Sequence, residues 1–236
     1  MVNFSKRSYQ KELLDRDDIP FADIEQNMKE LNTINSLLGG HAITVKGLQK
    51  ILNKQKLVLS PIHICEIGCG GGDNLLALHH YCKKNNIVIH CTGIDIKHSC
   101  IEFAKKRCTE LSATWITNDY QQVNFEGIKP HIIFSSLFCH HFVEDDLLKM
   151  LRWMHEQSSK GFFINDLERN WLAYYSIKFI TALFSKSYLV KNDAPLSVAR
   201  GFKKEEWQQL FATAGMPNCS ISWQWAFRHL IVCNHE

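Results

Sequence analysis

Five short apolar runs alternate with helical patterns along the central part of this 236-residue chain. Each run is rich in β-branched or aromatic residues and is bounded by turn residues, which is typical of buried strands. The runs read PIHICEIG, IVIHCTGID, SATWITND, PHIIFSSLF and GFFIND, and the helical patterns between them cover about residues 73–84, 99–111 and 144–157. Strands that alternate with helices pair in parallel through right-handed crossovers, so the sequence predicts an α/β fold.

The C-terminal part departs from this alternation. A helical pattern at about residues 203–214 is followed by SISWQWAF and HLIVCNH, with no helical pattern between these two runs. Adjacent strands joined by a short link run antiparallel. We therefore expect a seven-stranded, mostly parallel sheet with an antiparallel C-terminal hairpin and helices on both faces.

The N-terminal part is predicted to be helical. Apolar residues recur at three- and four-residue steps between Phe21 and Leu38, Gly39-Gly40 breaks the pattern, and Thr44 is a candidate cap for a second helix. We expect an N-terminal helical extension over residues 1–56 and a main domain over residues 57–236.

Composition excludes several classes of protein. The net charge of +3 is small and the basic residues are scattered, which argues against a nucleic-acid partner. The polar N-terminus shows no secretory signal. Of the nine cysteines, Cys65, Cys91, Cys139 and Cys233 lie in strand-like runs and no C-x-x-C pair occurs, so we expect buried reduced thiols and a cytoplasmic location.

The stretch EIGCGGGDN is the strongest candidate for a ligand site. Glycines between a strand and a helix let a ligand approach main-chain N–H groups. A dinucleotide fingerprint would require glycine where Asp73 stands, and the Lys-Ser/Thr pair of a P-loop is absent. The pattern present is E-x-G-x-G-x-G from Glu66. Asp95 ends the next strand, where an acid can accept hydrogen bonds from both ribose hydroxyls, and Asn118-Asp119 ends the strand after it.

These motifs resemble, in order and spacing, the class I S-adenosylmethionine-dependent methyltransferases, whose fold is Rossmann-like. The resemblance covers roughly residues 57–236 and implies S-adenosylmethionine as cofactor with no metal. It implies these cofactor-binding residues: Glu66, Gly68, Cys69, Gly70, Gly72, Asp73, Asp95, Ile96, Asn118, Asp119, Tyr120 and Ser135. Acidic side chains suit a sulfonium cation better than a pyrophosphate, which they would repel.

The fourth strand points to a small methyl acceptor. It lacks the acidic-Pro-Pro-aromatic motif of enzymes that methylate amide or nucleobase nitrogens. Its ending, SSLFCHHF, resembles the small-molecule branch, including ubiquinone/menaquinone-type and polyketide-modifying methyltransferases. His140 or His141 is a candidate base for an acceptor proton. The alternative is that one of them caps a helix or packs in the core.

Asp166 and Arg169 follow the fifth strand and have two interpretations. Asp166 is a natural N-cap for the next helix. Alternatively, Asp166 and Arg169 bind a polar group of the substrate, since a guanidinium suits an enolate or a carboxylate.

A strongly apolar stretch, WLAYYSIKFITALFSKSYLV, lies within a lid that we expect over about residues 169–200. Lys178 and Lys186 interrupt it, so no stable membrane insertion is expected, and a surface contact with a membrane is the weaker alternative. Its aromatic residues are candidates for the wall of a lipophilic pocket or for packing against the N-terminal helices; they are Trp171, Tyr174, Tyr175, Phe179 and Phe184. His41 of the extension is a further candidate for the site.

The leading hypothesis is methyl transfer by in-line displacement to the oxygen or carbon of a small, aromatic or lipophilic acceptor, of the kind found in secondary metabolism. Three alternatives are weighed against it. A protein or RNA methyltransferase would need a basic or aromatic exposed surface. A non-catalytic binding module would show a degraded glycine loop. A nicotinamide oxidoreductase is disfavoured by Asp73. No oligomeric state is predicted.

Overall fold

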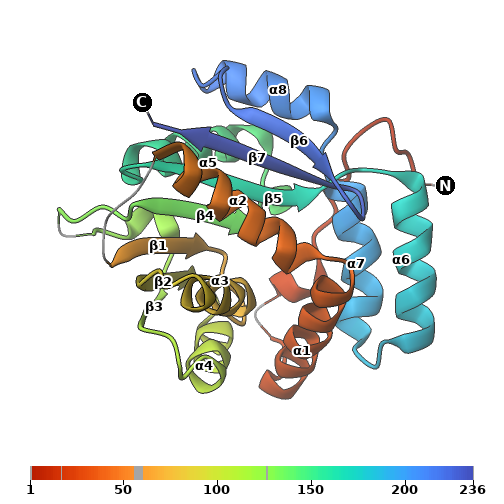
Figure 1. Ribbon diagram of the computed structural model, residues 1–236. Coiled ribbons are helices and arrows are strands. Elements are labelled where there is room, and N and C mark those ends of the chain that lie inside the picture. The colour runs from red at the N-terminus through yellow and green to blue at the C-terminus, as the bar shows by residue number, and fades with distance from the viewer. Residues whose placement is uncertain (1, 17, 56–60, 126, 236) are drawn as a thin grey trace.

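The structure, a computed structural model, describes residues 2–16, 18–55, 61–125 and 127–235. Seven strands form one sheet in the order β3-β2-β1-β4-β5-β7-β6 (Figure 1). The first five strands are parallel to their neighbours, whereas β7 is antiparallel to β5 and β6 is antiparallel to β7. The strands are β1 (Ile62–Ile67), β2 (Ile89–Asp95), β3 (Ala113–Thr117), β4 (Ile132–Ser136), β5 (Gly161–Leu167), β6 (Ser220–Gln224) and β7 (Arg228–Asn234). The predicted sheet is confirmed.

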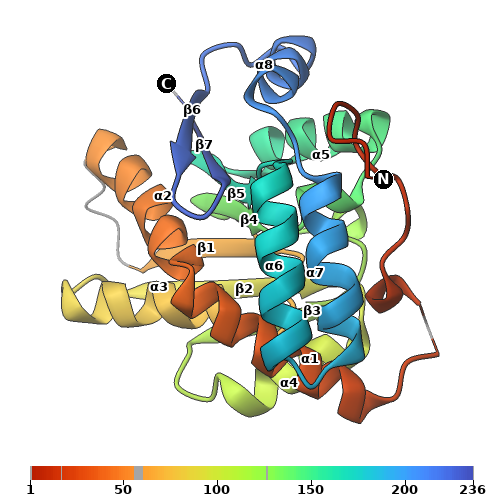
Figure 2. The same cartoon turned by 90° about the vertical axis from the view of Figure 1, so that its right-hand side faces the viewer.

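Helices cover both faces of the sheet (Figure 2). The α-helices are α1 (Phe21–Leu37), α2 (Gly40–Gln55), α3 (Asp73–Lys84), α4 (His98–Arg107), α5 (Glu144–Gln157), α6 (Trp171–Phe184), α7 (Tyr188–Arg200) and α8 (Lys204–Thr213), and three short 3-10 helices are η1 (Leu13–Asp15), η2 (Tyr120–Gln122) and η3 (Cys139–His141). Apolar residues of α2 and α3 form one core with the sheet, and those of α5 and α8 form the other. Because α2 packs on β5 and β7, the second N-terminal helix is part of the sheet layers.

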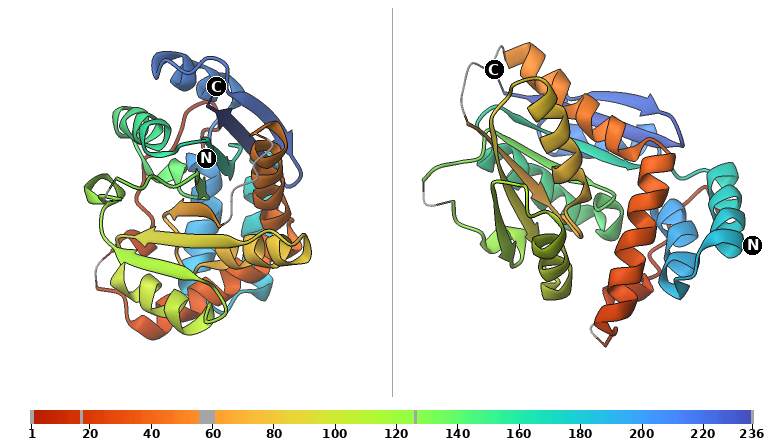
Figure 3. Two further views of the ribbon diagram at one scale, coloured as in Figure 1. Left: turned by 60° about the vertical axis from the view of Figure 1, so that its left-hand side comes forward. Right: turned by 60° about the horizontal axis from the view of Figure 1, so that its bottom comes forward.

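The helices α1, α6 and α7 lie at the edge where the parallel strands end (Figures 2 and 3). Helix α1 contacts α4 on one side and α7 on the other, while α6 packs on α7. Open α/β sheets bind ligands at the carboxyl ends of their strands. The N-terminal helices and the predicted lid therefore enclose that edge. The domain boundary expected at residue 57 lies outside the described residues.

Two local expectations are corrected. Helix α2 begins at Gly40, so Thr44 is inside the helix, where its hydroxyl donates to the carbonyl of Gly40. Cys233 is not a free thiol, since it forms a disulfide with Cys219 between β7 and the residue preceding β6. The antiparallel register of β6 and β7 pairs Ser220 with Val232, so Cys219, just before Ser220, lies opposite Cys233, just after Val232. The other seven cysteines are buried and unpaired.

Candidate active site

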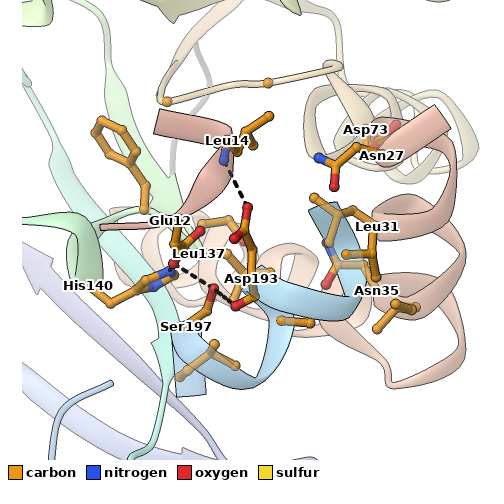
Figure 4. A pocket seen from close by; sticks show the side chains of 18 of the residues that line it. Glu12, Leu14, Asn27, Leu31, Asn35, Asp73, Leu137, His140, Asp193 and Ser197 are labelled. Carbon is orange, nitrogen blue, oxygen red and sulfur yellow. Dashed lines mark hydrogen bonds and ion pairs between the residues drawn. The ribbon is translucent and has the colours of Figure 1, made fainter. Parts of the chain in front are cut away.

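A cavity of about 440 Å³ lies at the carboxyl ends of the parallel strands. One side is formed by the loops after β1, β2 and β4, and the other by α1, α6 and α7 (Figure 4). Most of its wall is apolar and includes Leu14, Leu31, Ile34, Leu38, Phe138, Ile177, Ile180, Val190, Val198 and Phe227. A wall of this kind suits a ligand with a large lipophilic part.

The glycine loop forms one end of the cavity. Gly68, Gly70 and Gly72 all have positive φ, which glycine adopts without steric cost. A Cβ at Gly68 would lie 2.4 Å from the ring of Phe138, so this position also requires glycine for space. Gly68 and Gly70 line the cavity, whereas Gly72 faces the Trp115 ring behind the loop.

Asp95 ties the end of β2 to the glycine loop. Its two carboxylate oxygens accept hydrogen bonds from the backbone N–H groups of Gly70 and Lys97, each at 2.9 Å. Burial raises the pKa of Asp95, although both hydrogen bonds and the charge of Lys97 act in the opposite direction. Each carboxylate oxygen keeps a further lone pair, so Asp95 can still accept from ligand hydroxyls in the cavity.

Glu66 lies behind the loop. Its side chain is fully buried, and Oε1 accepts a hydrogen bond from Asn74 at 3.0 Å. Oε2 has no partner among the described residues. Burial raises the pKa of Glu66 well above its usual range. Asn74 reaches the cavity although Glu66 does not, so an effect of Glu66 on a ligand would be exerted through Asn74.

The other predicted cofactor residues divide into two groups. Cys69, Asp73 and Ile96 line the cavity, and Asp73 forms an ion pair with Arg107. The remaining four do not line it; they are Asn118, Asp119, Tyr120 and Ser135. Asp119 instead caps η2, and Tyr120 packs edge-on against Trp153 in the core. The roles of these four residues stay predictions.

His140 is enclosed between two carboxylates. Its Nδ1 lies 2.7 Å from Oδ1 of Asp166, and its Nε2 lies 3.5 Å from Oε1 of Glu12 at the cavity wall. Burial alone would lower the pKa of His140, but the charges and hydrogen bonds of Asp166 and Glu12 outweigh it and raise this pKa to about 9. The result is a proton-handling group with one nitrogen oriented by Asp166 and the other beside the cavity.

His141 has a more open setting. Its Nδ1 lies 3.2 Å from Oδ1 of Asp15, and its Nε2 lies 3.7 Å from Oε2 of Glu12. Its side chain is 22% exposed, against 2% for His140. Both histidines line the cavity, but only His140 is oriented by a fully buried partner.

Two arginines fix the backbone around these histidines. The Arg7 guanidinium donates to the carbonyls of His140 and Phe142. Arg200 donates to the carbonyls of His140 and His141, at 3.0 and 2.8 Å. The N-terminal segment and α7 are therefore attached to η3, and this attachment brings Glu12 to the site.

A metal is a second candidate occupant of this cluster. The ligand atoms of Glu12, His140 and His141 lie within 4.8 Å of one another. A divalent cation binds the neutral form of histidine, so it would compete with the proton that Asp166 and Glu12 stabilise on His140. The same distances are those of ion pairs between carboxylates and imidazolium, so proton handling is the better interpretation.

The predicted role of Arg169 is corrected. Arg169 does not line the cavity, because its guanidinium donates to both carboxylate oxygens of Glu206, at 2.9 and 2.8 Å, and to the carbonyls of Phe4 and Gly201. It is 1% exposed. The arginine joins the N-terminal segment to α8. Asp166 is not a helix cap either, since Asn170 caps α6 through the N–H of Leu172.

The aromatic residues expected to wall the pocket are also corrected. Trp171, Tyr175, Phe179 and Phe184 are exposed, and Tyr174 packs edge-on against Phe4. The residues of α6 that do line the cavity are Ala173, Ser176, Ile177 and Ile180. His41 does not line the cavity; its ring nitrogens contact Asn32 and Asn74 at 3.0 and 3.1 Å.

Several polar residues of the cavity were not predicted from the sequence. Asp193 accepts from the N–H groups of Leu13 and Leu14, and Ser197 donates to Glu12 at 2.7 Å (Figure 4). These contacts join residues about 180 positions apart. Sequence spacing carries no signal for such contacts. Arg228, at the start of β7, also lines the cavity.

Comparison with known proteins gives a family match and structural likenesses. Residues 64–161 match a family described as "Methyltransferase domain". The plantazolicin methyltransferase BpumL, in complex with a triazolic desmethylPZN analog and SAH, is 16% identical, covers 94% of this chain and 93% of its own, and has a TM-score of 0.68. The magnesium protoporphyrin IX methyltransferase of Synechocystis PCC 6803, with bound SAH, is 17% identical, covers 84% of each chain and has a TM-score of 0.54. The comparison with curated protein sequences gives no match.

Proposed function

We propose that this chain is a class I S-adenosylmethionine-dependent methyltransferase that methylates a hydroxyl group on a small lipophilic acceptor of aromatic, polyketide or quinone type. The observation that carries the proposal is the position of His140. Its Nε2 lies beside a cavity whose wall is mostly apolar, while Asp166 holds its Nδ1 at 2.7 Å. This arrangement supports removal of a proton from a hydroxyl as the methyl group is transferred.

The residues at the glycine loop fit the cofactor. The positive φ angles of Gly68 and Gly70 bring main chain to the cavity surface, and Asp95 has acceptor capacity left for ribose hydroxyls. No phosphate-binding lysine is needed, because the cofactor carries no phosphate. When bound, S-adenosylmethionine supplies an electrophilic methyl group on a sulfonium.

The chain's own residues supply position and proton transfer. The apolar wall excludes water and holds the acceptor, so that a large part of the rate arises from orientation. The neutral form of His140, which is the minor form at pH 7 because the pKa is about 9, accepts the hydroxyl proton at Nε2, and Asp166 stabilises the imidazolium that results. Glu12, 3.5 Å from Nε2, is placed to hold that proton through a hydrogen bond.

An amine acceptor is the second candidate. Three carboxylates line the acceptor side of the cavity, those of Glu12, Asp15 and Asp193, and they would attract a cationic amine. The plantazolicin methyltransferase, whose fold this chain shares, is described in complex with azole-containing desmethyl analogs of its product. In this chain Glu12 and Asp15 are already engaged by His140 and His141, which favours the hydroxyl.

The test is a screen for release of S-adenosylhomocysteine with matched acceptors. Naphthols represent lipophilic hydroxyls, 1,3-dicarbonyls represent carbon nucleophiles, and N-terminally free apolar peptides represent amines. The proposal predicts turnover with the naphthols and its loss in His140→Ala. Turnover with peptides alone would show that the acceptor is an amine and not a hydroxyl. If the protein does not bind S-adenosylmethionine, the proposal of a methyltransferase is wrong.

A further inference from the structure

Arg228 is a buried cation that forms no ion pair within the part of the chain that the structure describes. It is 2% exposed, and its Nη2 donates to Oδ1 of Asn35 at 2.9 Å. Its Nε and Nη1 have no acceptor among the described residues, and no ion pair of that part of the chain includes it. Burying a charge is costly unless a counter-charge and hydrogen bonds compensate for it. Arg228 therefore has two donors and a positive charge available at the cavity wall.

The surroundings of Arg228 add to this positive potential. A Cβ built on Gly40, the first residue of α2, would lie 2.9 Å from Nη1 of Arg228, so the guanidinium lies against the N-terminus of this 16-residue helix. The first N–H groups of a helix lack acceptors within the helix and carry partial positive charge. Asn35 lines the cavity beside Arg228 and offers an amide donor.

We propose that Arg228, Asn35 and the N-terminus of α2 bind a carboxylate in this cavity. The guanidinium fork matches the two oxygens of a carboxylate. We assign this carboxylate to the amino-acid part of S-adenosylmethionine, so the proposal rests on the proposed function. The position of α2 supports this assignment. His41, its second residue, contacts Asn74 beside the glycine loop, where the methionine part of the cofactor is expected. An acidic group on the acceptor is the other source of the same chemistry.

The experiment compares S-adenosylmethionine with its decarboxylated form by calorimetry. Wild type should prefer the carboxylated ligand by about tenfold or more. Arg228→Met should bind both forms with equal affinity. Arg228→Lys keeps the charge but loses the two parallel donors of the guanidinium, so its preference for the carboxylated form should be intermediate. If wild type does not bind S-adenosylmethionine, the proposed function fails. If it binds, and Arg228→Met keeps the full preference, the cofactor carboxylate is not the ligand.

A second arm addresses the acceptor. The enzyme is saturated with S-adenosylhomocysteine and titrated with benzoate, a small aromatic carboxylate. Binding to wild type that is lost in Arg228→Met would assign the carboxylate to the acceptor. No benzoate binding, together with an unchanged preference for S-adenosylmethionine in Arg228→Met, would overturn the proposal.

Thermal unfolding without ligand separates this role from a structural one. Because Arg228 is buried and forms no ion pair with a described residue, we expect Arg228→Met to keep or raise the melting temperature of the ligand-free protein. A lowered melting temperature together with unchanged ligand preference would show that Arg228 serves the fold and would also overturn the proposal.

A second and independent observation concerns the outer side of α6. Large apolar side chains on it are exposed, among them Phe179 at 66%, Leu183 at 60% and Phe184 at 78%. We call the whole set the α6 face; it consists of Trp171, Leu172, Tyr175, Phe179, Ile180, Leu183 and Phe184 of α6, together with Tyr188 at the start of α7. Contiguous apolar surface of this kind marks an interaction site.

The charged residues that the chain itself carries along the α6 face are basic, and the acidic residues in contact with it are Glu30 and Asp23 of α1, at its end near Ser185 and Tyr188. No acidic residue occurs between Glu168 and Asp193, whereas Lys178, Lys186 and Lys191 are all exposed there. The same helix also borders the cavity, since Ile180 belongs both to the α6 face and to the cavity wall. Among the described helices, none has the length and apolar character needed to cross a membrane.

We infer that the α6 face docks on the surface of an anionic lipid bilayer. Exposed apolar and aromatic residues enter the headgroup boundary, while lysines are attracted to the negative lipids. In a two-fold dimer the face would meet its own copy and bring the same three lysines together, which disfavours that occupant. Continuity with the cavity gives a lipophilic acceptor a short route from the bilayer.

Vesicle sedimentation tests this inference without the acceptor. The full chain should sediment with phosphatidylcholine vesicles that contain phosphatidylglycerol and much less with phosphatidylcholine alone. Replacing Lys178, Lys186 and Lys191 by Gln should weaken binding about 100-fold, at about fivefold for each lysine. Phe179→Glu/Phe184→Glu should abolish it, with Ile128→Glu, another exposed apolar site, as the matched control.

S-adenosylmethionine binding by these variants checks that they are folded and keeps this inference separate from the proposed function. No sedimentation of wild type with anionic vesicles would overturn the inference. The inference would also be overturned if wild type does not bind vesicles but self-associates, and if the double variant Phe179→Glu/Phe184→Glu is monomeric. The α6 face would then bind a second copy of the chain.

Discussion

Nδ1 of His140 lies 2.7 Å from Oδ1 of Asp166, and both side chains are removed from solvent. Asp166 also accepts the backbone N–H of His140, at 3.0 Å, so β5 fixes both the position and the ring orientation of this histidine. Asp166 does not line the cavity itself. It is a positioning residue for His140.

Replacing Asp166 by Asn should lower the limiting rate by about 10²-fold, because the imidazolium loses its compensating charge. The pKa of His140, which Asp166 helps to raise, should fall toward its usual value of 6.5. Steady-state rates across pH, with the acceptor found in the screen, measure both effects. Asp146→Asn, at a surface ion pair with Lys149, is the matched control. An unchanged pH profile would rule out this role.

His140 and His141 should differ although they are neighbours. His140→Ala should lose about 10²-fold or more in the limiting rate, because it removes the group that accepts the proton. His141→Ala should lose less than about tenfold, because the polar partners of its ring are Glu12 and the partly exposed Asp15, and neither orients it as Asp166 orients His140. Single-turnover rates at saturating S-adenosylmethionine make the comparison. A larger loss for His141→Ala would reverse the assignment.

The pH dependence follows from the pKa of about 9 for His140. Since the neutral ring is the base, kcat/KM should rise with pH, reach half of its maximum near pH 9 and level off above that pH. The free energy of unfolding should instead fall as pH rises. A pKa raised from 6.5 by folding stabilises the protein fully below pH 6.5, and this contribution is lost as pH rises through 9. Urea unfolding of wild type and Asp166→Asn across this range checks the second trend, which should be weaker in the variant.

Arg169 should affect stability and not ligand binding. Arg169→Met removes the partner of Glu206 and the donors to two backbone carbonyls, so the free energy of unfolding should fall by roughly 3 kcal/mol. Chemical denaturation measures this change, with calorimetry of S-adenosylmethionine as the control. Unchanged stability together with a raised KM for the acceptor would restore the substrate-binding interpretation.

The alternation of strands and helices predicts the sheet because each buried strand is a local pattern, and the final two strands predict the hairpin in the same way. Asp95 is the last residue of β2 and the loop glycines follow β1, so the sheet alone brings them to one edge. That part of the site is readable from the sequence.

The residues on the acceptor side of the cavity could not be predicted from the sequence in this way. Glu12 reaches His140 only because Arg7 and Arg200 attach distant segments to η3. Helix α6 is apolar on nearly all sides, so no periodicity shows which face packs inward, and its aromatic residues face outward. The chemistry of Arg169 suits a substrate, but Glu206, 37 residues away in sequence, already holds it.

The central claim is that the loop after β1 and the end of β2 hold S-adenosylmethionine, and calorimetry of Asp95→Ala against wild type tests it most directly. Wild type should bind S-adenosylmethionine and not NAD, and Asp95→Ala should bind it about tenfold or more weakly, because hydrogen bonds to a charged acceptor are lost. Equal affinity of the two proteins for S-adenosylmethionine, or no binding by wild type, would contradict the account.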